Sequence, residues 1–284
     1  MINTSETTAG TLYVVATPIG NLQDITFRAV EVLQHCIWAA CEDTRHSKRL
    51  FQAYNINCKQ IALHQHNENQ SAKNIIKLLL NGDDVALVSD AGTPLISDPG
   101  FPLVLLAHEH GIKVSPIPGP SALIAFLSVS AVKSQPFTFH GFLPAKKQQR
   151  LHFYQSLLPL NNTHVFYESS HRIVDSLEQV REVFGDDITV AMGRELTKQF
   201  EQIFRGTIVD LLELLQSDNN HQKGEFVIAI EAHKQKNDDN LNPAQQQLAQ
   251  NLMPYLPPKT AAKIVADQFN INKKKVYEYI LSCR

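Results

Sequence analysis

Short apolar runs alternate with polar segments along most of the chain. Within the first 122 residues, five such runs have the length and composition of buried strands: Leu12–Ala16, Ile37–Ala40, Ile61–Leu63, Val85–Val88 and Val114–Ile117. Helical periodicity lies between them, at Ile25–Gln34, Ser47–Tyr54, Gln70–Leu80 and Pro102–His110. Strands that alternate with helices are typical of a mostly parallel sheet. The pattern therefore predicts an α/β domain, which we place at residues 10–118.

A second α/β pattern follows and leads to a different kind of segment. Its strands are expected at Phe137–Phe142, Thr163–Tyr167, Ile188–Met192 and Glu225–Ile230, and its helices at Lys147–Leu158, Arg172–Phe184 and Ile208–Leu215. Residues 232–242 are polar and charged, which is the composition of a linker. After them, two helical stretches flank a turn at residues 270–272, as in a helix-turn-helix. We therefore expect a second α/β domain at 119–232 and a small helical unit at 243–284.

Composition narrows the class of protein. Hydrophobic residues make up 43% of the 284 positions, enough for sizeable cores, and the formal net charge of −2 excludes a globally basic nucleic-acid-binding protein but allows local basic patches. The four cysteines form no CxxC pair, which argues against a disulfide framework or a structural zinc site. A signal-peptide pattern is missing from the first residues, and the longest weakly apolar run, Ala122–Val132, is too short to span a bilayer. We expect a cytoplasmic protein without a membrane segment.

Polar or turn-forming residues follow each of the first five predicted strands. The most informative segment is Asp90–Gly100, where two acids, two glycines and two prolines come directly after Val85–Val88. The other four strands lead into Thr17–Asn21, Cys41–His46, His64–Glu68 and Pro118–Ala122. In open α/β sheets, ligands bind beyond the carboxyl ends of the strands. We therefore expect the five loops to converge on one binding site.

The kind of ligand is narrowed by what the loops contain. Neither a GxxxxGK phosphate loop nor a GxGxxG fingerprint occurs, which argues against ATP, GTP or an ordinary dinucleotide as the ligand. His64, His66 and Glu68 have metal-ligand spacing, but no further cluster would complete a shell, and we expect no metal. Asp43, Arg45 and His46 open a helix, where they form either a solvated helix face or a group that binds phosphate and accepts a proton.

Acidic and basic side chains also follow two strands of the second half. Glu168 and Glu195 are candidate acids, and Arg172, Arg194 and Lys198 are candidate anion-binding residues, with ordinary surface ion pairs as the alternative. Lys146 and Lys147 form a basic helix start that suits a phosphate backbone or is simply solvated. Lys273, Lys274 and Lys275 open the last predicted helix, where positive charge opposes the helix dipole and so indicates contact with a polyanion.

Taken together and in order, these motifs resemble one family from about Gly10 to Arg284. It is the RsmI family of bacterial ribosomal RNA small-subunit cytidine 2′-O-methyltransferases, part of the tetrapyrrole-methylase-like superfamily of S-adenosylmethionine-dependent enzymes. The motifs that carry the resemblance are Thr17–Asn21 with Asp24, Glu42–Arg45, Ser89–Gly100, Pro118–Ala122, Gly141–Lys146, Phe166–Arg172, Arg194–Lys198 and Lys223–Glu225. The resemblance implies two α/β domains with the methyl donor in the cleft between them, a helix-turn-helix-like tail and a homodimer.

The resemblance also implies roles for particular positions. S-adenosylmethionine, which leaves as S-adenosylhomocysteine, is expected near Pro18, Asp90, Ala91, Gly92, Thr93, Pro94, Pro120, Ser121, Ala122, Tyr167, Met192 and Gly193. A carboxylate or imidazole would take the proton of the ribose hydroxyl, and the candidates are Asp43, His46, Asp98, Glu168 and Glu195. Contacts with the RNA of the small subunit, in its decoding region, are expected from Arg45, Lys146, Lys147, Arg172, Arg194, Lys198, Lys273, Lys274 and Lys275.

Two other functions are compatible with parts of this pattern. A C-methyltransferase acting on a small tetrapyrrole would share the fold and the donor. However, the first loop is Thr17–Asn21 where that branch usually has a glycine-rich GxGPGD-like turn, which argues against a macrocyclic substrate. A DNA-binding regulator would use the helix-turn-helix and sense a ligand in the α/β part, but the net charge of −2 disfavours it.

Overall fold

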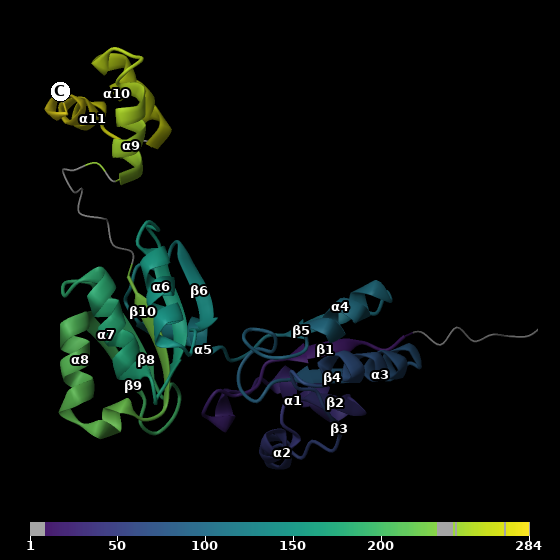
Figure 1. Cartoon of the computed structure of the whole chain (residues 1–284). Helices are drawn as coiled ribbons and strands as arrows, with labels where there is room; N and C mark the ends of the chain where they lie inside the picture. The colour runs from purple at the N-terminus through teal and green to yellow at the C-terminus, as the bar shows by residue number, and fades with distance from the viewer. Residues whose placement is uncertain (1–8, 232–240, 242, 270, 284) are drawn as a thin grey trace, which may run out of the picture. The chain divides into compact units, whose positions relative to one another are not determined.

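The computed structural model describes residues 9–231, 241, 243–269 and 271–283 (Figure 1). The chain separates into two compact units, residues 1–232 and 233–284. The first unit contains two five-stranded sheets, whose strand orders are β3-β2-β4-β1-β5 and β6-β7-β10-β8-β9. We call the part built on β1–β5 the first lobe and the part built on β6–β10 the second lobe.

The sheet of the first lobe is entirely parallel, as the sequence predicts. Its strands are β1 (Leu12–Val15), β2 (Trp38–Cys41), β3 (Lys59–Ala62), β4 (Val85–Val88) and β5 (Val114–Ile117). Its helices are η1 (Leu22–Asp24), α1 (Phe27–His35), α2 (Thr44–Ala53), α3 (Glu68–Leu80) and α4 (Phe101–Glu109). Because all five strands run in one direction, their carboxyl ends meet at one edge of the sheet.

Burial on both faces explains why β4 is apolar at every position. Val85 and Leu87 pack into a core with residues of α3 and α4, whereas Ala86 and Val88 pack on the opposite face with residues of α1 and α2. A strand covered on both sides has no polar face, so it appears in the sequence as a continuous apolar run.

The second lobe has a mixed sheet. Its strands are β6 (Phe137–Phe142), β7 (Thr163–Ser169), β8 (Thr189–Arg194), β9 (Gln202–Thr207) and β10 (Glu225–Ile230), and only β6 and β7 are parallel. Figure 1 shows α6 (Lys147–Leu157), α7 (Ile173–Phe184) and α8 (Ile208–Ser217) on one side of this sheet. On the other side, Phe126 of α5 (Ala122–Val129) packs with Val165, Ala191 and Val227. A short helix, η2 (Asn219–Gln222), precedes β10.

The C-terminal unit is helical. It consists of α9 (Pro243–Leu252), α10 (Pro258–Phe269) and α11 (Lys273–Ser282), around a small core that includes Ala261, Val265, Val276 and Ile280. The Asn272 side chain accepts a hydrogen bond of 2.8 Å from the Lys274 amide and so caps α11. The predicted linker at 232–242, Leu241 excepted, and Asn270 of the predicted turn lie outside the described residues. Within the described ranges, no helix has the length and apolar character needed to cross a bilayer.

Candidate functional site

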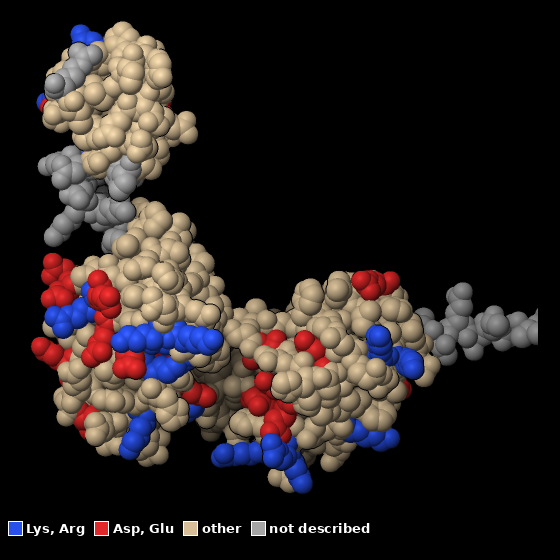
Figure 2. Space-filling view, in the orientation of Figure 1, with Lys and Arg blue, Asp and Glu red and all other residues tan. Residues whose placement is uncertain are grey.

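A cavity of about 560 Å³ lies at the carboxyl edge of the first sheet and is lined by both lobes. The first lobe contributes Ile19 after β1, Glu42 after β2, residues of the 90–98 loop after β4, and Ser121 and Ala122 after β5. From the second lobe come Phe142, Tyr167, Glu168, Ser169, Ser170, Leu196 and residues 224–227. Figure 2 shows acidic side chains gathered on the first lobe beside the hollow between the lobes. Four of the five predicted loops thus meet in one site.

Hydrogen bonds to the loops after β1 and β5 fix the loop after β4 in place. Thr17 and Gly92 exchange backbone hydrogen bonds of 2.9 and 3.0 Å, and the Thr93 hydroxyl donates to the Pro120 carbonyl at 3.1 Å. Gly92 has a φ of +85°, a backbone conformation that favours glycine. These contacts fix the loop against those that follow β1 and β5, and the loop lines the cavity with Asp90, Thr93, Ser97 and Asp98.

The loop after β3 supports the site without lining it. The Glu68 carboxylate accepts a hydrogen bond of 3.0 Å from the Gly100 amide and thereby holds the far end of the loop that follows β4. The rings of His64 and His66 lie edge to face, with centroids 6.0 Å apart. In the part of the chain that the structure describes, no three His, Cys, Asp or Glu side chains are arranged to hold a metal ion.

Three carboxylates of the first lobe border the cavity. The Asp90 carboxylate accepts a hydrogen bond of 3.0 Å from the Asp43 amide, and Glu42 accepts one of 3.3 Å from the Asp90 amide. Burial raises the pKa of Asp98 to about 6; a hydrogen bond from Ser89 lowers it in part, and the negative charges of Glu42 and Asp90 raise it further. Burial also raises the pKa of Glu42. This wall of the cavity suits a cationic ligand, and Asp98 is suited to accept a proton near neutral pH.

The predicted donor-binding residues divide into two groups. Seven line the cavity: Asp90, Ala91, Gly92, Thr93, Ser121, Ala122 and Tyr167. The other five, which are not lining residues, are Pro18, Pro94, Pro120, Met192 and Gly193. Met192 is fully buried on the face of the second sheet that α6, α7 and α8 cover. A Cβ added to Gly193 would lie 2.7 Å from the Phe126 ring, so this glycine lets α5 pack closely on the sheet.

Several lining residues were not identified from the sequence. Ile19 and Glu225 fall inside motifs that carried the family resemblance, although neither was given a role. Ile96 and Leu196 also lie in such motifs without a role of their own, whereas Val227 lies in a continuous apolar strand that nothing in the sequence marks as part of a site.

The candidate proton acceptors lie in different surroundings. Asp98 lines the cavity, whereas Asp43 and His46 belong to the start of α2 and do not. Asp43 caps α2 by accepting a 2.8 Å hydrogen bond from the Arg45 amide and also forms a 2.7 Å ion pair with the Arg45 guanidinium. Hydrogen bonds from Arg45 and its positive charge hold the pKa of Asp43 below its usual value. Asp43 is therefore a weaker proton acceptor than Asp98.

Glu168 is a lining residue of the cavity, but its side chain is buried. Successive side chains of a strand point to opposite faces, and Tyr167 packs on the same face of the sheet as α5. The Glu168 side chain is 0% exposed, and its Oε1 accepts hydrogen bonds of 2.8 Å from both the Arg172 guanidinium and the Ser169 amide. The structure thus places this carboxylate inside the second lobe, in an ion pair with Arg172.

We expect Glu168→Ala to reduce stability without altering the donor site. The substitution leaves the half-buried Arg172 and the Ser169 amide without their acceptor, so the free energy of unfolding should fall by roughly 2–3 kcal/mol. Urea unfolding measures this change, and Asp186→Ala, which breaks an exposed ion pair with Arg181, is the control with little expected effect. If the Glu168→Ala variant had normal stability but no catalytic activity, Glu168 would instead be assigned as the proton acceptor.

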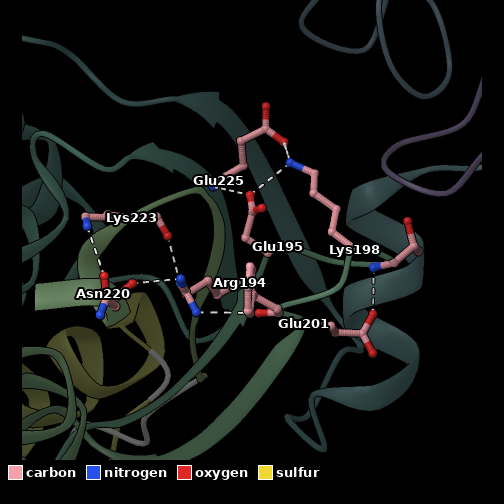
Figure 3. A network of polar contacts seen from close by, with 9 residues as sticks. Arg194, Glu195, Lys198, Glu201, Asn220, Lys223 and Glu225 are labelled. Atoms are coloured by element: carbon pink, nitrogen blue, oxygen red, sulfur yellow. Dashed lines mark hydrogen bonds and ion pairs between the residues drawn. The ribbon is translucent and has the colours of Figure 1, made fainter. Parts of the chain in front are cut away.

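A polar network after β8 joins three segments of the second lobe (Figure 3). Glu195 accepts hydrogen bonds from the Lys198 ammonium at 2.8 Å and from the Glu225 amide at 3.0 Å, and Lys198 also pairs with the Glu225 carboxylate at 2.8 Å. Burial alone would raise the pKa of Glu195, but the hydrogen bonds from Lys198 and the Glu225 amide outweigh it and lower that pKa. Glu195 and Lys198 therefore neutralise one another at the rim of the cavity.

Arg194 faces the interior of the same network. Only 9% of this residue is exposed, and its guanidinium donates to the carbonyls of Lys223 and Asn220 at 2.7 Å each and of Phe200 at 3.5 Å. In this position Arg194 stabilises the chain segment that leads into β10, and it does not face the solvent.

The other predicted RNA-contacting residues are more accessible. The Arg45 side chain is 89% exposed, and Lys146 and Lys147 are exposed at the start of α6. Arg172 is half-buried against Glu168. In the C-terminal unit, Lys273 and Lys274 are exposed and Lys275 is half-buried in the first turn of α11.

Two α/β lobes that share a cavity at the carboxyl edge of a parallel sheet define a protein of the tetrapyrrole methylase class. A family model described as "Tetrapyrrole (Corrin/Porphyrin) Methylases" matches residues 11–212. Among solved structures, the uroporphyrin-III-C-methyltransferase from Thermus thermophilus superposes with a TM-score of 0.54 at 19% identity, covering 78% of this chain and 94% of that one. The methyltransferase CobJ has a TM-score of 0.59 at 15% identity, covering 79% and 95%. These likenesses establish the fold.

The sequence comparisons identify a narrower group. Proteins named ribosomal RNA small subunit methyltransferase I are 44% identical to this chain in Escherichia coli O157:H7, over 98% of this chain and 96% of the relative. In Haemophilus influenzae the identity is also 44%, over 96% and 97%. A model of the RsmI C-terminal HTH domain matches residues 239–284. The chain belongs to the ribosomal RNA small subunit methyltransferase I family, which confirms the resemblance seen in the sequence.

Proposed function

We propose that this protein transfers a methyl group from S-adenosylmethionine to the ribose 2′-hydroxyl of a cytidine in the decoding region of 16S ribosomal RNA. The observation that carries the proposal is the position of Asp98, a carboxylate whose pKa is raised to about 6, in the cavity that both lobes line. The names of the relatives at 44% identity support the choice of small-subunit ribosomal RNA as substrate.

The cavity has the chemistry that the donor requires. When bound, S-adenosylmethionine supplies an electrophilic methyl group on a sulfonium sulfur. Glu42, Asp90 and Asp98 give the cavity negative charge, which favours a cationic ligand, and Ile19, Ile96 and Val227 offer apolar surface for an adenine ring. Residues 91–93 and 121–122, held by the hydrogen bonds among the loops, would hold the donor mainly through backbone groups.

Asp98 is the residue that accepts the proton of the ribose hydroxyl in this proposal. While the bound donor would supply the methyl group to the ribose oxygen, the Asp98 carboxylate would accept the hydroxyl proton and release it to solvent. A base with a pKa of about 6 is mostly ionised at neutral pH and still binds a proton more readily than an ordinary aspartate.

The RNA is held by basic residues in this proposal. Arg45, Lys146 and Lys147 in the first compact unit and Lys273 and Lys274 in the C-terminal unit are exposed and can pair with phosphates. A homodimer, which the family resemblance implies, and a cytoplasmic location complete the proposal. Methylation of a tetrapyrrole is less well supported, because the tetrapyrrole enzyme from Thermus thermophilus is only 19% identical, and at this level the likeness concerns the fold.

Binding of the donor and methylation of RNA can be tested in a single preparation. Calorimetric titration with S-adenosylmethionine should show one site per chain, and incorporation of labelled methyl groups into small ribosomal subunits that lack the modification should follow. Digestion of the product to nucleosides should then yield 2′-O-methylcytidine. Binding without RNA methylation would favour a small-molecule methylase, and the absence of binding would contradict both functions.

A further inference from the structure

We propose that Phe142 is the stacking platform for the nucleobase of the acceptor nucleotide. This inference rests on the function proposed above and assigns a role to a residue that lies within the Gly141–Lys146 motif but was given no role of its own. It is drawn from the register of β6, the backbone at Gly141, the exposure of the Phe142 ring and the basic residues that follow it.

An extra residue in β6 places Phe142 on the cavity side of the sheet. β6 pairs in parallel with β7, with Phe139 opposite Val165, but the next recorded pair is Phe142 opposite Tyr167. Three steps along β6 therefore match two steps along β7, which is a β-bulge. In an uninterrupted register Phe142 would lie opposite Glu168, whose side chain is buried in the second lobe. Because of the bulge, Phe142 lies on the same face of the sheet as Tyr167, and both residues line the cavity.

Gly141 makes the bulge possible and brings it close to the first lobe. Its φ is +64°, a conformation that favours glycine. A Cβ at this position would lie 3.0 Å from the Ser97 hydroxyl of the loop after β4. The bulge in the edge strand of the second lobe therefore lies directly against the loop that carries Asp98. As a result, Phe142 and Asp98 line the same cavity.

The Phe142 ring is supported from within the protein and remains open to solvent. Its centroid lies 5.4 Å from that of Tyr167, and Tyr167 in turn packs edge to face on Phe139 at 4.9 Å. Phe142 is nevertheless 60% exposed. Proteins that recognise single-stranded RNA stack unpaired bases on exposed aromatic rings. An exposed ring at the wall of a cavity that also contains the proton acceptor fits this use.

The segment after Phe142 carries exposed basic side chains that can bind the backbone of the RNA. Lys146 and Lys147 follow Phe142 by four and five residues and are exposed at the start of α6. Lysines in this position can neutralise phosphates while the ring stacks on the base. The short segment 142–147 thus offers an aromatic ring for a base and two ammonium groups for phosphates.

Substitution of Phe142 tests the proposal. Phe142→Ala and Phe142→Leu should lower kcat/KM for small ribosomal subunits by roughly 5- to 100-fold, mainly through a higher KM, and Phe142→Tyr should retain most of the activity because it keeps a flat ring. The dissociation constant of S-adenosylmethionine, measured by calorimetry, should change less than about twofold. Phe137→Ala is the matched control, since Phe137 begins the same strand, is 39% exposed and does not line the cavity.

Three outcomes would overturn the inference while leaving the proposed function intact. They are normal activity of Phe142→Leu, a loss of donor affinity in Phe142→Ala, and dissociation of a dimer in Phe142→Ala, which would make the ring a contact between copies of the chain. The wild-type protein supplies the separate test of the proposed function, because its failure to methylate small subunits would contradict that function whatever the variants do.

Discussion

The Asp98→Asn variant is expected to lose methyl transfer by roughly 10²- to 10⁴-fold, the range associated with removal of a general base. Asparagine keeps the size of the side chain but cannot accept the proton. The affinity for S-adenosylmethionine should fall by only a few fold, because Glu42 and Asp90 still line the cavity. Single-turnover methylation of small subunits at saturating donor measures the effect, and a rate within threefold of the wild type would rule out Asp98 as the base.

The pH dependence of the same rate distinguishes a base from a binding residue. Because burial raises the Asp98 pKa from its ordinary value to about 6, the wild-type rate should fall about tenfold per pH unit below 6 and level off above it. Asp98→Asn should lack this inflection. Asp43→Asn is the matched control: asparagine caps a helix as well as aspartate does, and Asp43 does not line the cavity, so its rate and pH profile should remain close to those of the wild type.

Removal of residues 243–284 is expected to raise KM for small subunits by about 100-fold while kcat at saturating substrate stays close to the wild-type value. This magnitude is at the lower end of the gain that a second, tethered binding module provides. The first compact unit has its own cores, and we expect the shortened chain to fold and to bind S-adenosylmethionine with unchanged affinity. Thermal unfolding and calorimetry check both points.

A triple substitution of the tail tests the same contact without truncation. The slope of the logarithm of the RNA-binding constant against the logarithm of salt concentration reports the number of phosphate contacts. Changing Lys273, Lys274 and Lys275 to alanine should reduce this slope by the equivalent of up to about three contacts. An unchanged KM in both the truncated chain and the triple variant would show that the C-terminal unit does not contribute to RNA binding.

The sequence predicts the strands that are apolar throughout, and it predicts helices less completely. Val85–Val88 and Val114–Ile117 have the bounds expected from their apolar runs. The helix α5 was not predicted: Ala122–Val129 is almost entirely apolar, so the run lacks the alternation of polar and apolar faces that marks a surface helix. The strand β9 was missed because Gln202–Thr207 is short and mixes exposed and half-buried positions.

The candidate site shows a sharper limit of sequence reasoning. The sequence predicts the loop Asp90–Gly100 as part of a site because acids, glycines and prolines directly follow a buried strand, and the loop does line the cavity. Glu168 and Tyr167 are neighbours in a strand, and the sequence does not tell which of them faces the cavity, since β7 is largely buried on both sides and lacks a polar face. Phe142 could not be assigned to a face either, because its side depends on a bulge that only the pairing with β7 reveals.

The bulge in β6 also bears on how this site can diversify. β6 is an edge strand with β7 as its only neighbour in the sheet, so the gain or loss of one residue there disturbs a single pairing. Such a change would exchange the side chain presented to the cavity, and because Gly141 lies against Ser97 it would also act on the loop that carries Asp98. In the proposed mechanism, this edge strand would therefore influence both the fit of the substrate and the position of the proton acceptor.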